Sequence, residues 1–436
     1  MRSLVFRIAM AAALSATGAA GVAAQAPAPL ERTELRVGNL LDTSGPTAGT
    51  GRIIAAGKAD AFAFVNRTGA INGKRLTIDS FDYAYQAPRA LAQLRKWKAE
   101  NVIAVQGYRE MDAEVWLGMP VEERLRVPFW TLAPAAQLTD PQGKGPRGSR
   151  AAPFTFAALP SYSDGVRALL QWAAEDWKRK GKQGKPRYVH MGDTQPLASA
   201  ARAAGEEFAR EQGFEVIPPI QYPVPGEDGE APCLSLKLAG VTHAYLANPA
   251  AENVVLLRSC RAIGVQVQFL SNLWGLHEPA MKGAGEAADG VVMVGAGAPW
   301  GSDVPGMRVL QEVSRSSDPS GREYRPLPYA RAACGVLYMA EAMKWADQNG
   351  GVTPENIRKA MYQRKNWVPY GLDGVCGPAS YSDSDHRGVT AIGLLQAVVK
   401  GPTEQGDVSE LMRNGTMALK PVQTIEVPRK PEWLGW

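Results

Sequence analysis

The chain is poor in the residues from which catalytic and metal sites are usually built. It has four histidines and four cysteines among 436 residues, and no C-x-x-C pair. His277 and Glu278 are followed by Pro279 and by no second histidine, so H-E-x-x-H is absent, as is G-x-S-x-G. These absences argue against a hydrolase, a redox enzyme or a zinc protein. We expect no catalytic residue, no metal and no cofactor.

The sequence context of the histidines indicates structural roles. His190 and His243 lie within apolar strand-like runs, which favours neutral core residues. His386 stands beside Asp383 and Asp385 in "SDSDHRG", a polar run that predicts a surface turn. The "GAG" at 295–297 is not followed by a helical pattern, so it is a weak dinucleotide signal.

Long hydrophobic runs are missing except at the N-terminus. Arg2 and Arg7 flank the start of an apolar run at 8–22, and the small residues "VAA" end at Ala24. That pattern is typical of a cleaved signal peptide. The absence of a cysteine near the cut argues against a lipoprotein signal. No other stretch approaches the roughly 18 apolar residues of a membrane span. We predict a signal peptide at 1–24 and a soluble mature chain exported to the periplasm.

Charge of one sign is not concentrated along the chain. The formal net charge of +5 falls to +3 when Arg2 and Arg7 leave with the signal peptide. The basic cluster "KRKGKQGKPR" at 178–187 lacks the interleaved aromatics of a nucleic-acid-binding surface. A solvated helix end and linker explains this cluster better, so we expect no nucleic-acid partner.

Four cysteines in an exported chain favour disulfides, because the compartment is oxidising. Cys233 begins one apolar helical segment and Cys260 ends the helical segment after the next strand, so the two could join neighbouring helices. We predict the pairs Cys233–Cys260 and Cys334–Cys376.

The stretch at 36–66 has the order strand, glycine-rich loop, helix. Arg52 and Ile53 follow Gly51, so neither the P-loop spacing nor G-x-G-x-x-G is met. A helix start with hydroxyls suits a single carboxylate or a small polar group. An ordinary capped turn is an equally good explanation of this stretch.

The rest of the chain alternates short apolar runs with helical patterns, which predicts parallel sheets covered by helices. The expected strands are 35–41, 75–82, 102–106, 129–132, 187–191, 214–218, 243–247, 266–270, 290–295 and 390–399. The expected helices are 53–66, 87–100, 111–123, 164–179, 197–212, 232–239, 252–263, 278–283, 329–348 and 354–363. The polar tail from 401, with Pro421, Pro428 and Pro431, is expected to wrap along the surface, and "PEWLGW" to be an anchored terminus.

Several segments, in this order along the chain, resemble the type I periplasmic solute-binding proteins of ABC importers, the leucine/isoleucine/valine-binding family. The segments are "LLDTSGPTAGTG", "VNRTGAINGKRLTIDSFDYAYQAPRA", "PFWTLAPAAQLTDP", the run at 232–270 and "GPASYSDSDHRG". The resemblance covers nearly the whole mature chain, and it depends on the order of these segments.

The resemblance implies an α/β fold of two similar doubly wound parallel-sheet lobes joined by a three-strand hinge. Lobe 1 would comprise 33–153 and 300–370, and lobe 2 would comprise 154–297 and 371–436. Such a protein is a monomer that closes on a small-molecule solute and docks transiently with permease and ATPase subunits.

The resemblance also implies where the solute binds. In lobe 1, hydroxyls and amides after the first, third and fourth strands hold a carboxylate. The expected ligand-binding residues of both lobes are Ser44, Gly107, Tyr108, Thr131, Ala133, Thr194, Asn248, Asn272, Trp274 and Trp300. Tyr108 and "TLAPA" depart from the family's small Ser and Thr residues. Core packing is an equal alternative for Trp300.

The largest departure from the family lies after the strand at 266–270. Amino-acid binders carry an acidic residue there, whereas this chain has Asn272, Leu273 and Trp274. A buried ammonium without a carboxylate is costly. We therefore expect a small organic acid, amide or aromatic compound instead of a free α-amino acid. A periplasmic sensor for a signalling receptor, with the same fold, is the alternative function, and an exported enzyme is a weaker one.

Overall fold

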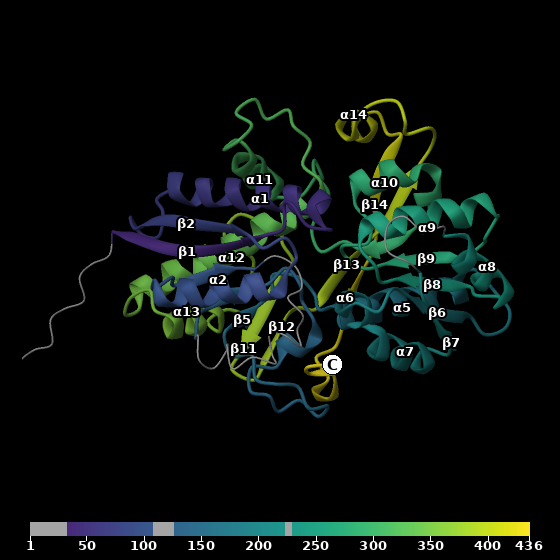
Figure 1. Cartoon of the computed structure of the whole chain (residues 1–436), viewed down its shortest axis with the longest axis horizontal. Coiled ribbons are helices and arrows are strands. Elements are labelled where there is room, and N and C mark those ends of the chain that lie inside the picture. Colours follow the sequence, from purple (N-terminus) through teal and green to yellow (C-terminus); the bar gives the residue numbers. More distant parts are fainter. Residues whose placement is uncertain (1–32, 108–125, 223–228) are drawn as a thin grey trace, which may run out of the picture. The chain divides into compact units, whose positions relative to one another are not determined.

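The computed structural model describes residues 33–107, 126–222 and 229–436 (Figure 1). The predicted signal peptide and the predicted helix at 111–123 lie outside these residues. Two larger sheets and one hairpin make up the strands of this part of the chain.

The first sheet has five parallel strands in the order β2-β1-β3-β4-β5. Its strands are β1 (Glu34–Leu41), β2 (Arg75–Asp82), β3 (Ala104–Gln106), β4 (Phe129–Trp130) and β5 (Thr155–Phe156). Strand β1 lies between β2 and β3 and is buried along most of its length, which fits its run of Leu, Val and Gly residues.

Helices from two separate parts of the chain pack with the first sheet. They are α1 (Ala48–Arg67), α2 (Ala87–Ala99), the 3₁₀ turn η1 (Ala136–Thr139), α11 (Met307–Ser314), α12 (Leu327–Gln348) and α13 (Pro354–Met361). Helix α1 contacts both α11 and α12. A Cβ at Gly57 of α1 would lie 2.4 Å from the carbonyl oxygen of Tyr329, so glycine permits this close approach of α1 to α12.

The second sheet has seven strands in the order β14-β13-β10-β9-β8-β6-β7. Its strands are β6 (Arg187–Met191), β7 (Glu215–Ile220), β8 (His243–Leu246), β9 (Gln268–Ser271), β10 (Val292–Val294), β13 (Ala391–Val399) and β14 (Met417–Glu426). Strands β6 to β10 pair in parallel, while β13 pairs antiparallel with both β10 and β14.

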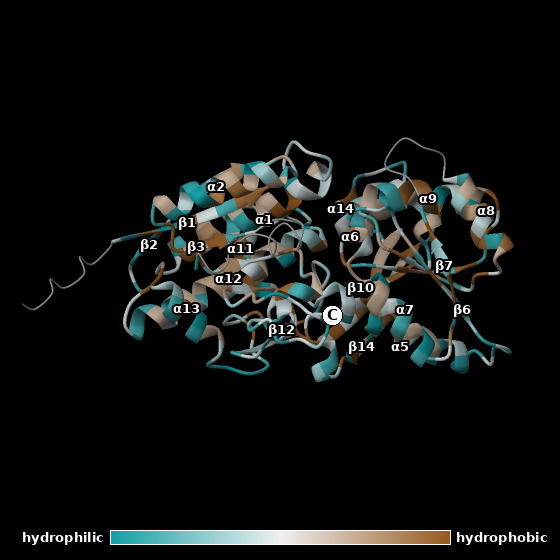
Figure 2. Cartoon of the chain, turned by 60° about the horizontal axis from the view of Figure 1, so that its bottom comes forward, coloured by the Kyte–Doolittle hydropathy of each residue, from teal (hydrophilic) through white to brown (hydrophobic). Residues whose placement is uncertain are grey.

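The helices that accompany the second sheet are mostly amphipathic. They are α5 (Tyr162–Arg179), α6 (Pro196–Ser199), α7 (Arg202–Glu211), α8 (Glu230–Leu238), α9 (Ala250–Ala262), α10 (Glu278–Ala284), α14 (Val408–Arg413) and the 3₁₀ turns η2 (Gly285–Ala288) and η3 (Pro431–Trp433). Helix α7 mixes hydrophilic and hydrophobic residues along its length (Figure 2), and buries Ala204, Gly205, Phe208 and Ala209.

The first sheet with its helices and the second sheet with its helices form two sets of elements. The chain passes between these two sets three times. It leaves the first sheet after β5, returns after β10 to form α11–α13, and enters the second sheet again at β13. The α/β fold with two parallel-sheet lobes and three connections, predicted from the sequence, is confirmed.

Both predicted disulfides are confirmed. Cys233 of α8 is bonded to Cys260 of α9 with a Cα–Cα distance of 5.0 Å. Cys334 of α12 is bonded to Cys376 with a Cα–Cα distance of 5.7 Å.

A hairpin of β11 (Ala379–Ser382) and β12 (Asp385–Val389) corrects one prediction. His386 is buried in β12 and is not part of a surface turn. Its ring stacks on Phe156, and its two nitrogens contact the Thr155 carbonyl and the Tyr362 hydroxyl, each at 2.8 Å. The apolar neighbours of His386 come from distant segments, so the local "SDSDHRG" pattern did not indicate burial.

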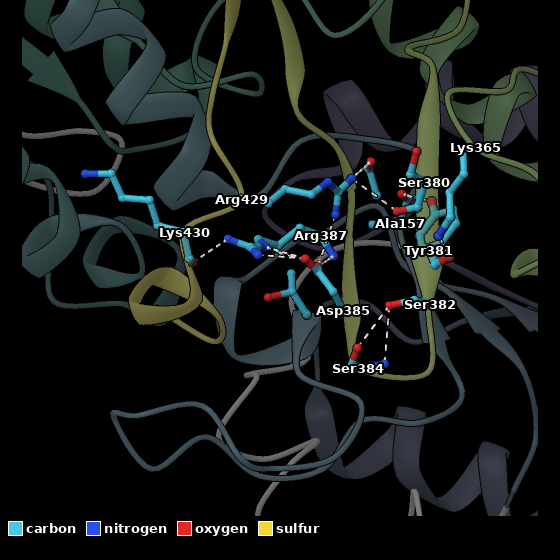
Figure 3. Close-up of polar contacts among 12 residues, drawn as sticks. Ala157, Lys365, Ser380, Tyr381, Ser382, Ser384, Asp385, Arg387, Arg429 and Lys430 are labelled. Atoms are coloured by element: carbon cyan, nitrogen blue, oxygen red, sulfur yellow. Dashed lines mark hydrogen bonds and ion pairs between the residues drawn. The ribbon is translucent and has the colours of Figure 1, made fainter.

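The C-terminal tail corrects a second prediction. Residues 417–426 form β14, which pairs along the whole of β13, instead of wrapping along the surface. Beyond β14, Arg429 donates to the carbonyls of Ser380 and Gly388, and Arg387 donates to the Lys430 carbonyl (Figure 3). The predicted anchoring of the terminus is confirmed, because Trp433 is buried.

Candidate functional site

The loop after β1 is held together by its own carboxylates. Buried Asp42 accepts hydrogen bonds from the amides of Gly45 and Thr47, at 2.7 and 3.1 Å, and from the Thr47 hydroxyl at 2.5 Å. These two amides at the start of α1 are therefore paired within the protein. The expected ligand-binding residue Ser44 is exposed in this loop.

A second carboxylate, Asp82 at the end of β2, supports the same loop. It accepts from the amide and hydroxyl of Thr43 at 3.1 and 2.7 Å, and from the amide of Ala84 at 3.0 Å. Burial acts to raise the pKa of Asp82, but hydrogen bonds from Thr43, Ser44 and Ala84 outweigh it and lower the pKa to about 2. Two carboxylates, Asp42 in the loop and Asp82 at the end of β2, thus hold the loop and its hydroxyls.

The ends of β3 and β4 are tied to each other and to a buried lysine. The Gly107 amide donates to the Trp130 carbonyl at 2.7 Å. Lys58 of α1 donates to the carbonyls of Leu40 and Gly107, at 3.0 and 2.5 Å. Burial lowers the pKa of Lys58 well below its usual value. The expected site residue Tyr108, next in the chain, lies outside the described residues.

Two further expected residues, Thr131 and Ala133, are buried after β4. The Ala133 amide donates to the Thr131 hydroxyl at 2.8 Å, which fixes the turn. In this arrangement the Thr131 hydroxyl serves the local backbone.

On the second sheet, Asn248 and Asn272 organise the strand ends. The Asn248 side chain accepts from the Asp193 amide at 2.8 Å. The Asn272 amide group donates to the carbonyls of Leu246, Ala247 and Asn248 at 2.9–3.1 Å. Both asparagines are fully or nearly fully buried. Thr194, by contrast, is exposed.

The segment between β9 and α10 contacts the first sheet at two points. The Trp274 indole N–H donates to the Leu132 carbonyl at 3.1 Å, and His277 Nε2 lies 3.0 Å from the Thr50 hydroxyl. Trp274 and His277 are both buried. Because Leu132 follows β4 and Thr50 lies on α1, these contacts join the carboxyl ends of the two sheets.

Trp300 lies apart from these contacts. Its ring packs edge-on against Tyr329 of α12, with the ring centroids 6.3 Å apart, and it is partly buried against the core of the first set of elements.

Beside the His277–Thr50 contact lies a pocket of about 410 Å³. Its lining comes from the starts of α1, α9 and α10, which are the first turns after the loops predicted to bind the solute. The lining residues are Pro46, Thr47, Gly49, Thr50, Pro249, Ala250, Ala251, Glu252, Val254, His277, Pro279 and Ala280.

The pocket combines apolar walls with a few polar groups. Prolines and alanines form half of the lining, while two threonines, Glu252 and His277 supply hydroxyls, a carboxylate and an imidazole. Ligand pockets are commonly built in this way. Sequence reasoning missed Glu252 and His277, although an acidic residue in the first turn of the helix after a strand was a usable signal.

The sequence matches the periplasmic binding protein family over residues 34–403. The chain belongs to this family. The family consists of solute-binding proteins, and the parallel sheets, the three connections and the pocket at the strand ends are those of a type I member.

Solved structures of family members are similar in fold. A substrate-binding protein of an ABC transporter from Aeropyrum pernix has 19% identity and a TM-score of 0.74, covering 92% of this chain and 98% of its own. A branched-chain amino acid ABC transporter protein from Thermus thermophilus with bound valine has the same identity and TM-score, with coverage of 91% and 97%. A fatty acid ABC transporter substrate-binding protein from Thermomonospora curvata has 17% identity and a TM-score of 0.71, with coverage of 90% and 92%.

No curated protein sequence matches this chain. Within 33–107, 126–222 and 229–436, no helix has both the length and the apolar character that crossing a membrane requires.

Proposed function

We propose that this chain is the periplasmic solute-binding subunit of an ABC importer. It captures a small organic solute between its lobes and delivers it to the membrane permease. The observation that carries the proposal is the pocket at the carboxyl ends of the two sheets, where ligands of open α/β sheets bind. Two of the similar structures are proteins of ABC transporters for branched-chain amino acids and for fatty acids, which supports the transport role.

The proposal includes a signal peptide, two moving lobes and a set of solute-binding residues. Residues 1–24 are removed on export, and a monomer closes by moving lobe 1 against lobe 2. The expected bounds, 33–153 plus 300–370 and 154–297 plus 371–436, shift because β5 and residues of the 372–389 segment pack with the first sheet. Of the ten expected residues, Ser44, Asn248, Asn272 and Trp274 lie on the loops that precede α1, α9 and α10. Thr47, Thr50, Glu252 and His277 line the pocket itself.

The pocket chemistry favours a small solute with a polar end and an apolar body, such as an organic or aromatic acid, an amide or an amino-acid-like compound. Proline and alanine side chains contact the body, and the carboxylate of Glu252 accepts from an N–H of the solute. Glu252 supplies the carboxylate that is missing after β9, so the pocket accommodates the ammonium of an amino-acid-like solute as well as an amide N–H.

The direct test is to purify the mature protein, denature it, and identify co-eluting small molecules by mass spectrometry. The compound found, and a panel of acids, amides and amino acids, are then titrated calorimetrically. A charge-assisted hydrogen bond to Glu252 predicts that Glu252→Gln weakens binding by about tenfold to a hundredfold.

Glu211→Gln, at the exposed end of α7, is the matched control and should leave the affinity unchanged. A protein that binds nothing from the panel and carries no co-eluting compound would refute the proposal. Solute binding by a protein whose gene lies beside a sensor kinase, with no permease gene nearby, would favour the sensor function instead.

A further inference from the structure

Trp274 lies in the cleft between the two sets of elements, outside the proposed solute pocket. It is fully buried, it is absent from the pocket lining, and it packs in a core cluster that contains residues of both sheets, among them Leu132 and Ile392. Its indole N–H donates across the cleft to the Leu132 carbonyl at 3.1 Å. The ring thus lies between the ends of β4 and β9, beside the proposed solute pocket.

The backbone of Trp274 is fixed from the second sheet. Its amide donates to the Asn272 side-chain oxygen at 2.7 Å, while the amide group of Asn272 donates to three carbonyls at the end of β8 and directly after it. Turning the indole out would break the buried hydrogen bond between its N–H and the Leu132 carbonyl, while the backbone of Trp274 would stay fixed. The ring is therefore held in place.

The other side of the ring is supported by Arg331 of α12. The Arg331 guanidinium lies 5.4 Å from the Trp274 ring centroid and donates to the carbonyls of Leu273 and Gly295. Arg331 is itself fully buried. A cation over an indole face is attractive, more so when it is removed from water. Trp274 is thus enclosed by residues from both sets of elements.

We propose that Trp274 sets the size and place of the solute site. Its indole fills the centre of the cleft, bridges the two lobes, and confines the solute to the pocket beside α1 and α9. The proposal rests on the proposed solute-binding function. It assigns Trp274 a role different from the ligand-binding one expected from the resemblance: the side chain excludes a larger or aromatic solute from the centre of the cleft.

The test is to remove the Trp274 ring by mutation and to add free indole as a replacement for it. Trp274→Ala should create an indole-sized cavity in the cleft, and apolar cavities of this kind bind matching aromatic molecules. We expect indole to bind this variant at least a hundredfold more tightly than wild type in calorimetry. Because the cavity lies between the lobes, indole should also reduce the radius of gyration of the variant measured by X-ray scattering.

Trp97→Ala is the matched control. Trp97 of α2 is also buried and also donates its indole N–H, to Asp79 at 2.8 Å, but it lies within the first set of elements. Indole bound there should leave the radius of gyration unchanged. If Trp274→Ala does not fold, Trp274→Leu with benzene as the probe serves the same purpose.

Failure of the Trp274 variants to bind the aromatic probe more tightly than wild type, or binding without a change in radius, would overturn the proposal. Titration of wild type with its own solute tests the proposed function separately. The two can therefore fail independently.

Discussion

At the scale of single residues, buried polar side chains with particular partners help to define this fold. His190, His243 and His386 are each buried, and burial lowers the pKa of each to about 4. The two histidines expected in the core are confirmed there. His386 shows how such a residue is accommodated: since the Thr155 carbonyl can only accept, Nδ1 carries the proton, and the Tyr362 hydroxyl donates to Nε2.

The lowered histidine pKa values predict acid sensitivity. An unfolded histidine protonates near pH 6.5, whereas the folded one stays neutral to about pH 4, so stability is lost as pH falls through this window. For His386 the slope of the unfolding free energy should be about 1.4 kcal/mol per pH unit. Urea unfolding of His386→Gln from pH 7.5 to 4.5 should show a slope that is smaller by this amount.

Tyr362→Phe is the control for the histidine prediction. It removes the hydrogen bond to Nε2 but keeps the imidazole, so stability should fall while the dependence on pH remains. An unchanged slope in His386→Gln would show that His386 does not titrate in this window.

At the scale of elements, the two disulfides join segments that are distant in the sequence. Cys233–Cys260 ties α8 to α9 across a separation of 27 residues, and Cys334–Cys376 ties α12 to the segment before β11 across 42. On the chain-entropy model, each closure contributes about 3–4 kcal/mol by restricting the unfolded chain. Urea unfolding of Cys233→Ala/Cys260→Ala should show a loss of this size.

Reduction provides the check on that disulfide prediction. A reductant should destabilise wild type by more than it destabilises the double variant, which retains only Cys334–Cys376. Equal stability of the wild-type and double-variant proteins without reductant would contradict the assigned contribution.

The C-terminal segment is a second link between elements, because it packs on parts of both sets. The buried Trp433 ring lies 4.2 Å from the Arg167 guanidinium of α5, and edge-on to Phe208 of α7. The Gly435 amide donates to Thr139 of η1 at 3.4 Å. This terminus is structural.

Truncation of Trp433 tests the anchoring of the terminus. Trp433→Ala should lower the unfolding free energy by about 3–5 kcal/mol, since it removes a buried aromatic ring. Leu238→Ser, on α8, is the control: its side chain is 89% exposed, so its effect should stay within about 0.5 kcal/mol. A similar effect of the two substitutions would mean that the terminus contributes little.

At the scale of the whole molecule, the proposed function requires coupling between solute binding and lobe closure. A solute that contacts both lobes stabilises the closed form. At a concentration of a hundred times its Kd, it should raise the unfolding free energy by about 2.7 kcal/mol. It should also reduce the radius of gyration in X-ray scattering. Binding without any change in scattering would contradict closure.

The regular parts of the fold could be predicted because their signals are local. The strands at 35–41, 75–82 and 187–191 were found almost to the residue, since each is a short apolar run bounded by turns. Strand β14 was missed: it mixes polar and apolar residues, lies at the edge of the sheet, and has Pro421 where the register with β13 shifts.

The amino-acid sequence by itself determined the α/β alternation, the family and the cysteine pairs, because these depend on periodicity and on the order of segments. The tertiary structure decided which side chains meet between the sheets. The Trp274–Leu132 and His277–Thr50 contacts join residues that are 142 and 227 positions apart. Contacts of this kind depend on the packing of whole elements, and no local pattern in the sequence encodes them.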